Sequence, residues 1–480
     1  MDSIQVLFLG TGTSTGLPLT PCLTISQPYP PEFQAHVPRP NSPGPETPVD
    51  AHDGRYDSRK PWPGNVPCHC CRSSVDRNVP EGWKNKRGNT SIIVRRKDSG
   101  GQWKNILVDC GKSFVENARR FFPRWGVQMV DAVLLTHGHA DAYFGLDDLR
   151  EWCLRAKRHI PIYLNQETYD NVAASFPYLV DATKASGGGD LPMLQFNVID
   201  DHSSFTLFDI PITSYPVHHG IYFSSDTAGT SVEPRPLICL AYSFAKSILY
   251  MADVSQVPNS TWALMEEDGV VPIVLKNQDM ARVDSSSESP AADLVDHLDR
   301  SLDLTAPTRP QLKILIIDAL WPLRRHLSHF SFGQAAETAL RIQPSMTYLL
   351  GSTHPTTHYM WEEICLAVSG RASIHSPKSI NPLHPCSTVK EESWSKTDHP
   401  DNQFAQDLVQ RIKESDEFAD QPATDQRGII SQWKESGGAL EPAWDGLVCQ
   451  VDLHSAADIS ADEGWHVVSG PQGSTGGWTA

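Results

Sequence analysis

The chain has 480 residues, of which 39% are hydrophobic and 20% are charged, and its formal net charge is −17. This length and composition suit one large or two ordinary globular domains. No apolar run approaches the roughly 20 residues of a membrane helix, and no basic segment precedes the apolar start, so we expect neither a membrane span nor a secretory leader.

The charge is spread over the whole chain. Residues 370–480 hold 17 acidic and 8 basic side chains, a net −9, and residues 1–369 hold 40 acidic and 32 basic ones, a net −8. Neither part has the basic stripe that a nucleic-acid backbone requires, so nucleic acid is not an expected partner. Ten cysteines, three of them in PCHCC at residues 67–71, favour free thiols or metal ligation over disulfides. We therefore expect a protein of the cytoplasm or nucleus.

Short β-rich apolar runs recur along the chain and predict strands. They cover residues 4–10, 89–96, 105–111, 131–137, 160–165, 211–219, 236–244, 247–253, 312–320 and 346–354. Helical periodicity falls between some of them, at residues 112–125, 146–157, 165–180 and 332–342. This alternation predicts an α/β protein whose helices pack outside its strands.

Composition also predicts the domain organisation. The main domain is expected at residues 1–369, with insertions at about 24–66 and 281–310, where proline, serine and aspartate are dense. The later segments are predicted as a polar insertion at 370–432, a return to the core at 433–454 and a disordered tail at 455–480.

Five of the predicted strands end in a histidine or an aspartate. These ends carry His137, the pair His218 and His219, Asp253, Asp318, and His354. The first continues as His137-x-His139-x-Asp141, and side chains two residues apart point the same way, so both histidines can hold one ion while Asp141 faces a second. Imidazole and carboxylate suit Zn²⁺, Mn²⁺ or Fe²⁺, and a water ionised on such a metal is a nucleophile for hydrolysis.

Ten short segments carry a resemblance to a known family. In chain order they are FLGTGTSTGLP, PCHCC, NTSIIV, ILVDCGKSF, LLTHGHADAYFGLDDLR, YPVHHG, MADVS, IDALW, SHFS and GSTH. With them the sequence resembles the metallo-β-lactamase-fold hydrolases, in the branch of phosphoribosyl 1,2-cyclic phosphate phosphodiesterase and its fungal and plant relatives. The resemblance covers most of residues 1–370 and returns at 433–453. It implies an αββα sandwich with the metal site at one edge, between the two sheets.

The resemblance also implies a set of metal ligands. His137, His139 and His219 would bind a first ion, and Asp253 would bridge to a second. Asp141, which is also expected to take part in catalysis, and His354 would bind the second ion.

Position 142 departs from the general family pattern. The pattern has a further histidine where this chain has Ala142, which leaves open whether one or two ions bind. His218 could supply the missing imidazole, but neighbours on a strand point to opposite sides, so an ordinary histidine facing away from His219 is the simpler interpretation.

Other residues are expected to support the chemistry. His329 is the expected acid, because the branch places a histidine here against the scissile phosphate and an imidazole can protonate a leaving alkoxide. His326 is its rival. Asp109 and Asp318 are expected to orient neighbouring groups rather than to bind metal. The small-residue loop GTGTSTG at 10–16 is expected to form a tight turn.

A second metal site follows from the resemblance alone. The related phosphodiesterase ties a cysteine cluster to a histidine shortly after the last active-site histidine. Transferred to this sequence, that site is a structural zinc held by Cys68, Cys70, Cys71 and His358. Plain buried thiols are the alternative.

Together these features predict a metal-dependent hydrolase, with one or two active-site Zn or Mn ions, that acts on a small, possibly cyclic, phosphate ester by attack of a metal-held hydroxide. A thioesterase or lactonase of the same fold is an alternative, because fold alone does not choose among them. A non-catalytic metal-binding scaffold is the competing class, suggested by Ala142 and the insertions.

Overall fold

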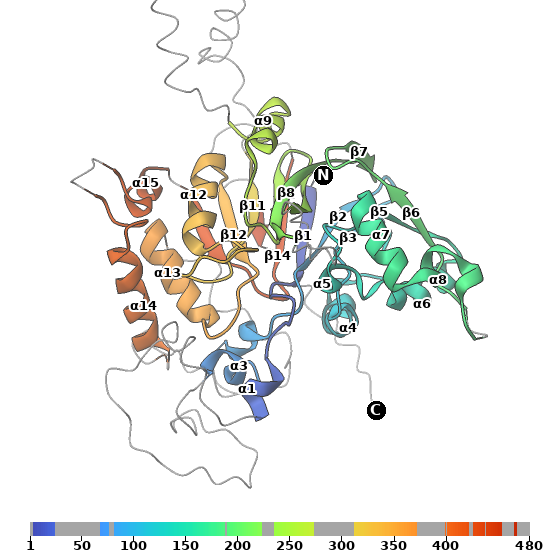
Figure 1. Cartoon of the computed structure of the whole chain (residues 1–480), viewed down its shortest axis with the longest axis horizontal. Helices are drawn as coiled ribbons and strands as arrows, with labels where there is room; N and C mark the ends of the chain where they lie inside the picture. The colour runs from blue at the N-terminus through green and yellow to red at the C-terminus, as the bar shows by residue number, and fades with distance from the viewer. Residues whose placement is uncertain are drawn as a thin grey trace, which may run out of the picture.

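A computed structural model describes most of the predicted main domain (Figure 1). The described residues are 3–24, 68–75, 81–187, 190–222, 235–272, 312–371, 399, 401–421, 426–436, 438–453 and 465–467. The predicted insertions 24–66 and 281–310 fall outside this part, except for residue 24, as does most of the predicted tail. No helix in the described part is long and apolar enough to cross a membrane.

Two mixed sheets form the centre of the molecule. The first has the order β15-β14-β1-β2-β3-β4-β5-β6 and the second has the order β13-β12-β11-β10-β9-β8-β7. The strands of the first sheet are β1 (Ser3–Gly10), β2 (Ser91–Lys97), β3 (Trp103–Val108), β4 (Ala132–Leu134), β5 (Ile160–Leu164), β6 (Leu194–Val198), β14 (Val448–Asp452) and β15 (Trp465–Val467). Those of the second are β7 (Ser204–Leu207), β8 (Ile210–Ile221), β9 (Pro236–Phe244), β10 (Ile248–Met251), β11 (Ile314–Asp318), β12 (Met346–Leu350) and β13 (Ala439–Pro442).

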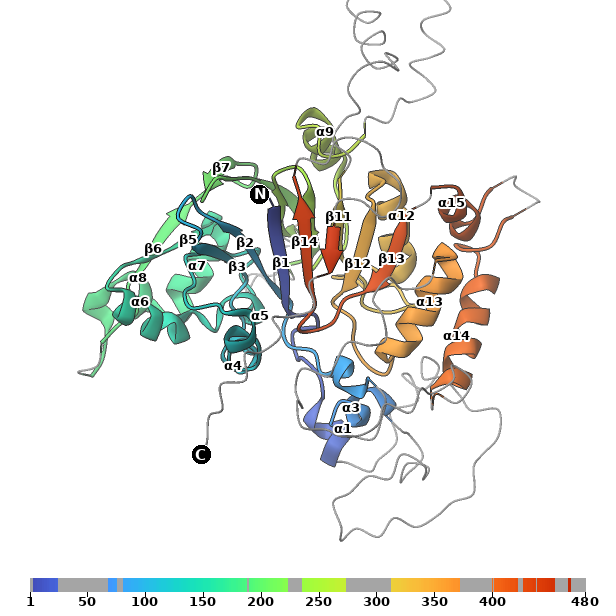
Figure 2. The same cartoon turned by 180° about the vertical axis from the view of Figure 1, so that it is seen from behind.

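Helices cover the outer face of each sheet, as both views of the molecule show (Figures 1 and 2). The flank of the first sheet carries α4 (Phe114–Trp125), α5 (Ala140–Tyr143), η2 (Leu146–Leu149), α6 (Arg150–Ala156), α7 (Gln166–Ser175), α8 (Pro177–Val180) and η3 (Ala182–Lys184). The flank of the second carries α9 (Asn259–Glu267), α12 (Phe332–Ile342), α13 (His358–Ser369), α14 (Asn402–Glu414) and α15 (Ile429–Ser436). Near the start of the chain lie α1 (Thr20–Thr24), α3 (His69–Ser73) and η1 (Gly82–Asn85).

Three apolar layers hold this arrangement together. The layer between the sheets includes Phe8, Tyr242, Tyr250 and Tyr348, all fully buried. The other two layers lie between each sheet and its helices. Strands such as β11 and β12 are buried on both faces, which is why their sequences are continuous apolar runs rather than alternating ones. The αββα sandwich predicted from the sequence is confirmed.

The C-terminal part is more ordered than its composition indicates. Within the predicted polar insertion 370–432, α14 packs against α13 and buries Leu408 and Ile412. These two residues lie four apart on one face of the helix, so an amphipathic stripe was present within a polar segment. In the predicted disordered tail, β15 pairs with β14.

The segment after α15 completes both sheets. β13 extends the second sheet beside β12, and β14 runs antiparallel to β1 (Figure 2). Asp445, in the loop between them, accepts hydrogen bonds from the Thr11 N–H and hydroxyl at 2.8 Å each and from the Gly88 N–H at 2.7 Å. The small-residue loop after β1 therefore uses its backbone groups within the protein, as expected of a tight turn.

Candidate metal centre and active site

The predicted chemistry gathers where strands of both sheets end. β4 runs toward His137, β8 carries His219, β10 precedes Asp253 and β11 ends at Asp318. The sheets are joined at this edge by a 2.8 Å hydrogen bond from the Leu240 N–H to the Thr136 carbonyl. Residues from four strands thus lie together at one edge of the sandwich.

Three imidazoles form the centre of this cluster. The ring centroids of His137, His139 and His219 lie 4.7–5.1 Å apart, and their ligand nitrogens all lie within 4.8 Å of one another. His137 and His219 are buried, whereas His139 is exposed. The cluster therefore has a protein side and a side open to solvent.

Hydrogen bonds fix which nitrogen of each buried ring carries its proton. His219 Nδ1 lies 2.6 Å from the Ser328 carbonyl and must donate to it. The Thr136 hydroxyl donates to Asp109, so it accepts from His137 Nδ1 at 2.8 Å. Both rings therefore keep a lone pair on Nε2, the nitrogen left for a metal.

The residues fit a divalent metal ion. His137 Nε2 is buried and has no hydrogen-bond partner among the described residues, an arrangement that costs stability unless something binds there. Burial lowers the pKa of His137 well below its usual value and that of His219 to about 3, so both rings are neutral at pH 7. Neutral imidazoles with free lone pairs are the ligands that Zn²⁺ and Mn²⁺ require.

Asp253 links the three imidazoles to a second group that could hold a metal, formed by His219, Asp253 and His329. Its carboxylate oxygen lies within 4.8 Å of ligand nitrogens of both His219 and His329. Asp253 has a φ of 49°, a left-handed conformation that turns the chain just after β10. Burial, with smaller effects from Asp141 and Asp318, raises its pKa to about 8, and a bound cation would favour the charged form instead.

His329 is held by Asp318. Its Nδ1 lies 2.7 Å from Asp318 Oδ2 and 3.7 Å from Asp253 Oδ1. Burial alone would lower the pKa of His329, but the charge and hydrogen bond of Asp318 outweigh burial and raise that pKa to about 9. His329 is therefore protonated at neutral pH in this arrangement, and its Nε2 N–H is available as a proton donor.

A separate cluster of thiols lies near α1 and α3. Cys22, Cys68 and Cys71 place their sulfurs 3.5, 3.2 and 3.8 Å from Nδ1 of His354. The Leu19 N–H also points at the Cys71 sulfur, 3.3 Å away. Hydrogen bonds from the other two thiols lower the pKa of Cys22. Three sulfurs and one imidazole are a usual ligand set for a structural zinc.

Comparison with known proteins identifies the family. The sequence model of the Beta-lactamase superfamily domain matches residues 104–351, just over half of the chain. The chain belongs to the metallo-β-lactamase superfamily. Most members of this superfamily are metal-dependent hydrolases that bind divalent metals.

Several known proteins are similar to this metallo-β-lactamase-fold chain. A diphosphatase of the PhnP family is 19% identical, with a TM-score of 0.43, over 74% of this chain and 89% of that one. YhfI from Bacillus subtilis is 12% identical, with a TM-score of 0.43, over 94% and 100%. An octanoyltransferase from Porphyromonas gingivalis is 33% identical over 157 residues, which are 32% of this chain and 28% of that protein. The match thus spans less than a third of that relative's length.

The structure brings together most of the expected active-site residues. His137, His139, His219, Asp253 and His329 share the edge described above. Asp109 lies behind them, bonded to Thr136 rather than facing the imidazole nitrogens. His326, exposed beside His329, has its ring centroid 5.4 Å from that of His329.

Asp141 and His218 belong to none of the three groups of described residues that could hold a metal. Asp141 lies in the first turn of α5, where its charge acts on His139 and Asp253. Neither residue supplies a ligand atom to the metal-binding groups found among the described residues. The buried Ala142 uses its carbonyl to accept a hydrogen bond from Cys110. Among the described residues, the groups that could hold a metal contain no imidazole beyond those of His137, His139, His219, His329 and His354.

The predicted zinc ligands need correction. Cys70 and His358 lie outside the thiol cluster, while Cys22 and His354 belong to it. Residues three apart share a helix face, so Cys68 and Cys71 point the same way at α3 while Cys70 points elsewhere. His358 begins α13, with Nε2 3.0 Å from Glu362. His354, which the resemblance places at the second active-site ion, instead faces the thiols with its Nδ1.

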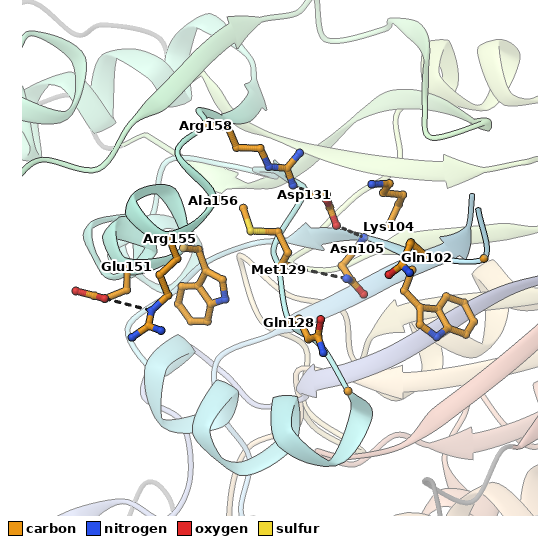
Figure 3. A pocket seen from close by; sticks show the side chains of 14 residues that line it. Gln102, Lys104, Asn105, Gln128, Met129, Asp131, Glu151, Arg155, Ala156 and Arg158 are labelled. Carbon is orange, nitrogen blue, oxygen red and sulfur yellow. Dashed lines mark hydrogen bonds and ion pairs between the residues drawn. The ribbon is translucent and has the colours of Figure 1, made fainter. Parts of the chain in front are cut away.

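A hollow of about 800 Å³ lies at the opposite ends of β3 and β4 (Figure 3). Asn105, Met129 and Asp131 line it together with residues of α6. Arg158 pairs with Asp131 and Arg155 with Glu151 within the lining, and Lys104 pairs with Asp98 outside it. No histidine or cysteine is among the residues that line it, and His137 lies beyond the other end of β4.

Proposed function

We propose that the chain is a metal-dependent phosphodiesterase that acts on small phosphate esters, including cyclic ones. One observation carries the proposal: His329, oriented by Asp318, stands beside three imidazoles and a carboxylate that fit a metal. A divalent ion supplies Lewis acidity and an acidified water, the chemistry that phosphodiester hydrolysis needs. The chain's own residues then supply orientation and a proton.

Ligand orientation comes from the hydrogen bonds behind the imidazoles. Asp109 holds Thr136, which in turn holds His137, and the Ser328 carbonyl holds His219. These hydrogen bonds hold the rings of His137 and His219 in one orientation, so their Nε2 lone pairs are in place before a metal binds. Such supporting hydrogen bonds typically change metal affinity or activity 10- to 100-fold when they are removed.

Proton delivery is assigned to His329. Its Nδ1 is engaged by Asp318, so Nε2 is the atom that would donate to the leaving oxygen. An alkoxide is a poor leaving group that needs this proton, whereas a thiolate needs it much less. A positioned acid beside the metal ligands therefore favours a phosphate ester over the thioester of the alternative function.

The charge around the site also favours a small anionic substrate with a metal. Asp141, Asp253 and Asp318 each raise the pKa of His329, and Asp109 lies behind His137, bonded to Thr136. Arg325 pairs with Glu417, and Arg324 stacks on Trp321. An anion would approach these carboxylates only where a bound cation offsets their charge.

The test compares substrates that differ in leaving group. The purified chain, supplied with Zn²⁺ or Mn²⁺, should hydrolyse bis-(p-nitrophenyl) phosphate and a cyclic ribose phosphate. His329→Ala should slow the cyclic ester by roughly 10²- to 10⁴-fold, and should slow the nitrophenyl ester less, because nitrophenolate leaves without a proton.

His326→Ala is the matched control, since it removes an exposed imidazole three residues away. It should leave both rates close to those of the wild type. Hydrolysis of a thioester or a lactone without any phosphodiester turnover would overturn the proposal in favour of the alternative enzyme. No turnover of any ester by metal-loaded protein would favour the scaffold.

A further inference from the structure

The donors expected for a second active-site ion do not converge. By resemblance these donors were Asp141, His354 and the residue at position 142. Ala142 offers no ligand, and Asp141 supplies no atom to either active-site group formed by the described residues. The first ion, in contrast, has His137, His139 and His219. The first expected ion therefore has three converging ligands in this chain, whereas the ligands expected for the second ion do not converge.

His354 lies beyond the end of β12 and belongs to the thiol cluster, not to the active-site groups formed by the described residues. The strand ends at Leu350, and Gly351 follows with a φ of +71°. A Cβ atom at Gly351 would lie 2.2 Å from Asp318 Oδ1, so the strand can present no side chain there while Asp318 keeps its place. Three residues later, His354 has turned its Nδ1 to within 3.2 Å of the Cys68 sulfur.

His329 and Asp318 occupy the far side of Asp253. A bridging carboxylate needs one ion near each oxygen, and paired catalytic ions lie about 3.5–4 Å apart. Here Asp253 Oδ1 faces His329 Nδ1 at 3.7 Å, and Asp318 Oδ2 holds that nitrogen at 2.7 Å. His329 Nδ1, the ring nitrogen nearest to Asp253, is thus engaged by the Asp318 carboxylate rather than left open as a ligand for a second ion.

We infer that the catalytic centre is built for a single metal ion, bound by His137, His139, His219 and Asp253, with the His329–Asp318 pair in place of a second ion. The inference rests on the proposed function and narrows it to a one-metal mechanism. The group of His219, Asp253 and His329 shares His219 with the imidazole cluster, and its His329 Nδ1 is engaged by Asp318, so the inference counts one ion at the active site and one at the thiol cluster, two per chain.

Elemental analysis of the full chain tests this count. The protein is incubated with Zn²⁺ and Mn²⁺, desalted and measured, and we expect two ions per chain. His139→Ala should leave one, and this exposed residue can be changed without disturbing the core. Asp141→Asn, the matched control, should leave two ions, because Asp141 is expected to bind only a second catalytic ion.

The spectrum of bound manganese provides a second measurement. Thiols favour zinc and oxygen-nitrogen sites accept manganese, so Mn²⁺ should report on the imidazole cluster. We expect the electron paramagnetic resonance spectrum of an isolated Mn²⁺ ion. Three ions per chain that fall to two in Asp141→Asn, or the spectrum of a coupled Mn²⁺ pair, would overturn the inference and leave the proposed function intact. A single ion that persists in His139→Ala would overturn both.

Discussion

Replacing Cys22 by serine should weaken the zinc binding that we propose for the thiol cluster. Cys22 lies 46 residues before Cys68 in the sequence, yet its sulfur is 3.5 Å from His354 Nδ1. Loss of even an outer-shell partner weakens metal binding about 10- to 100-fold, so loss of a ligand should cost at least that. This is about 1.4–2.7 kcal/mol, and linkage removes the same amount from the free energy of unfolding when zinc is saturating.

Zinc content and thermal denaturation of purified Cys22→Ser protein, with and without added zinc, measure this effect. Cys70→Ser is the matched control, because Cys70 is fully buried in the same region but is not part of the cluster. The wild type should melt at a higher temperature when zinc is added, and Cys22→Ser should lose most of that response. Zinc lost from Cys70→Ser but kept in Cys22→Ser would refute the assignment of ligands.

Three further predictions concern single side chains. Asp318→Asn should move the alkaline limb of the pH profile of kcat/KM toward lower pH. The activity needs protonated His329 and is lost as pH rises through the pKa of His329, which Asp318 raises. An alkaline limb at the wild-type pH would contradict this. Burial lowers the pKa of His358, so its contribution to stability is present above about pH 6.5 and lost on acidification. His358→Gln should make the free energy of unfolding fall less steeply between pH 7 and 5, by at most about 1.4 kcal/mol per pH unit, and an unchanged slope in denaturant unfolding at each pH would contradict this. Gly351→Ala should reduce both stability and turnover. Gly126→Ala is the control, because Gly126 has a similar φ of +64° but open space around it, and it should cost only the roughly 1–2 kcal/mol of a left-handed alanine. Equal losses of stability in the two variants, measured by denaturant unfolding, would contradict the close contact with Asp318.

The fold was largely predictable because its strands are buried. Ten apolar runs correspond to strands, since a strand covered on both faces leaves a continuous apolar signal. β6 was missed because its residues are half-exposed or exposed, as in Val198, and its pattern is therefore weak. α14 was missed because its average composition is polar, although Leu408 and Ile412 mark its buried face.

The sequence indicated the imidazole cluster better than the thiol cluster. His137 and His139 are neighbours in a single segment, so local spacing alone brings them together. The thiol cluster joins Cys22 and His354, which are 332 residues apart, and no local pattern predicts that contact. Spacing also could not choose between Cys70 and Cys71, because the choice depends on the orientation of a short helix.

The place of β14 constrains how the chain folds during synthesis. Phe8 N–H bonds to the Leu447 carbonyl, and Thr11 bonds to Asp445 across 434 residues. Contacts between such distant residues carry a large loop-closure cost and slow folding. During synthesis β1 can pair with β2 early, but it cannot pair with β14 until residues 445–452 have emerged, at about 5–20 residues per second. The loop after β1 thus gains its final shape only when the last part of the sandwich has been made, and a nascent chain exposes one side of its first strand until then.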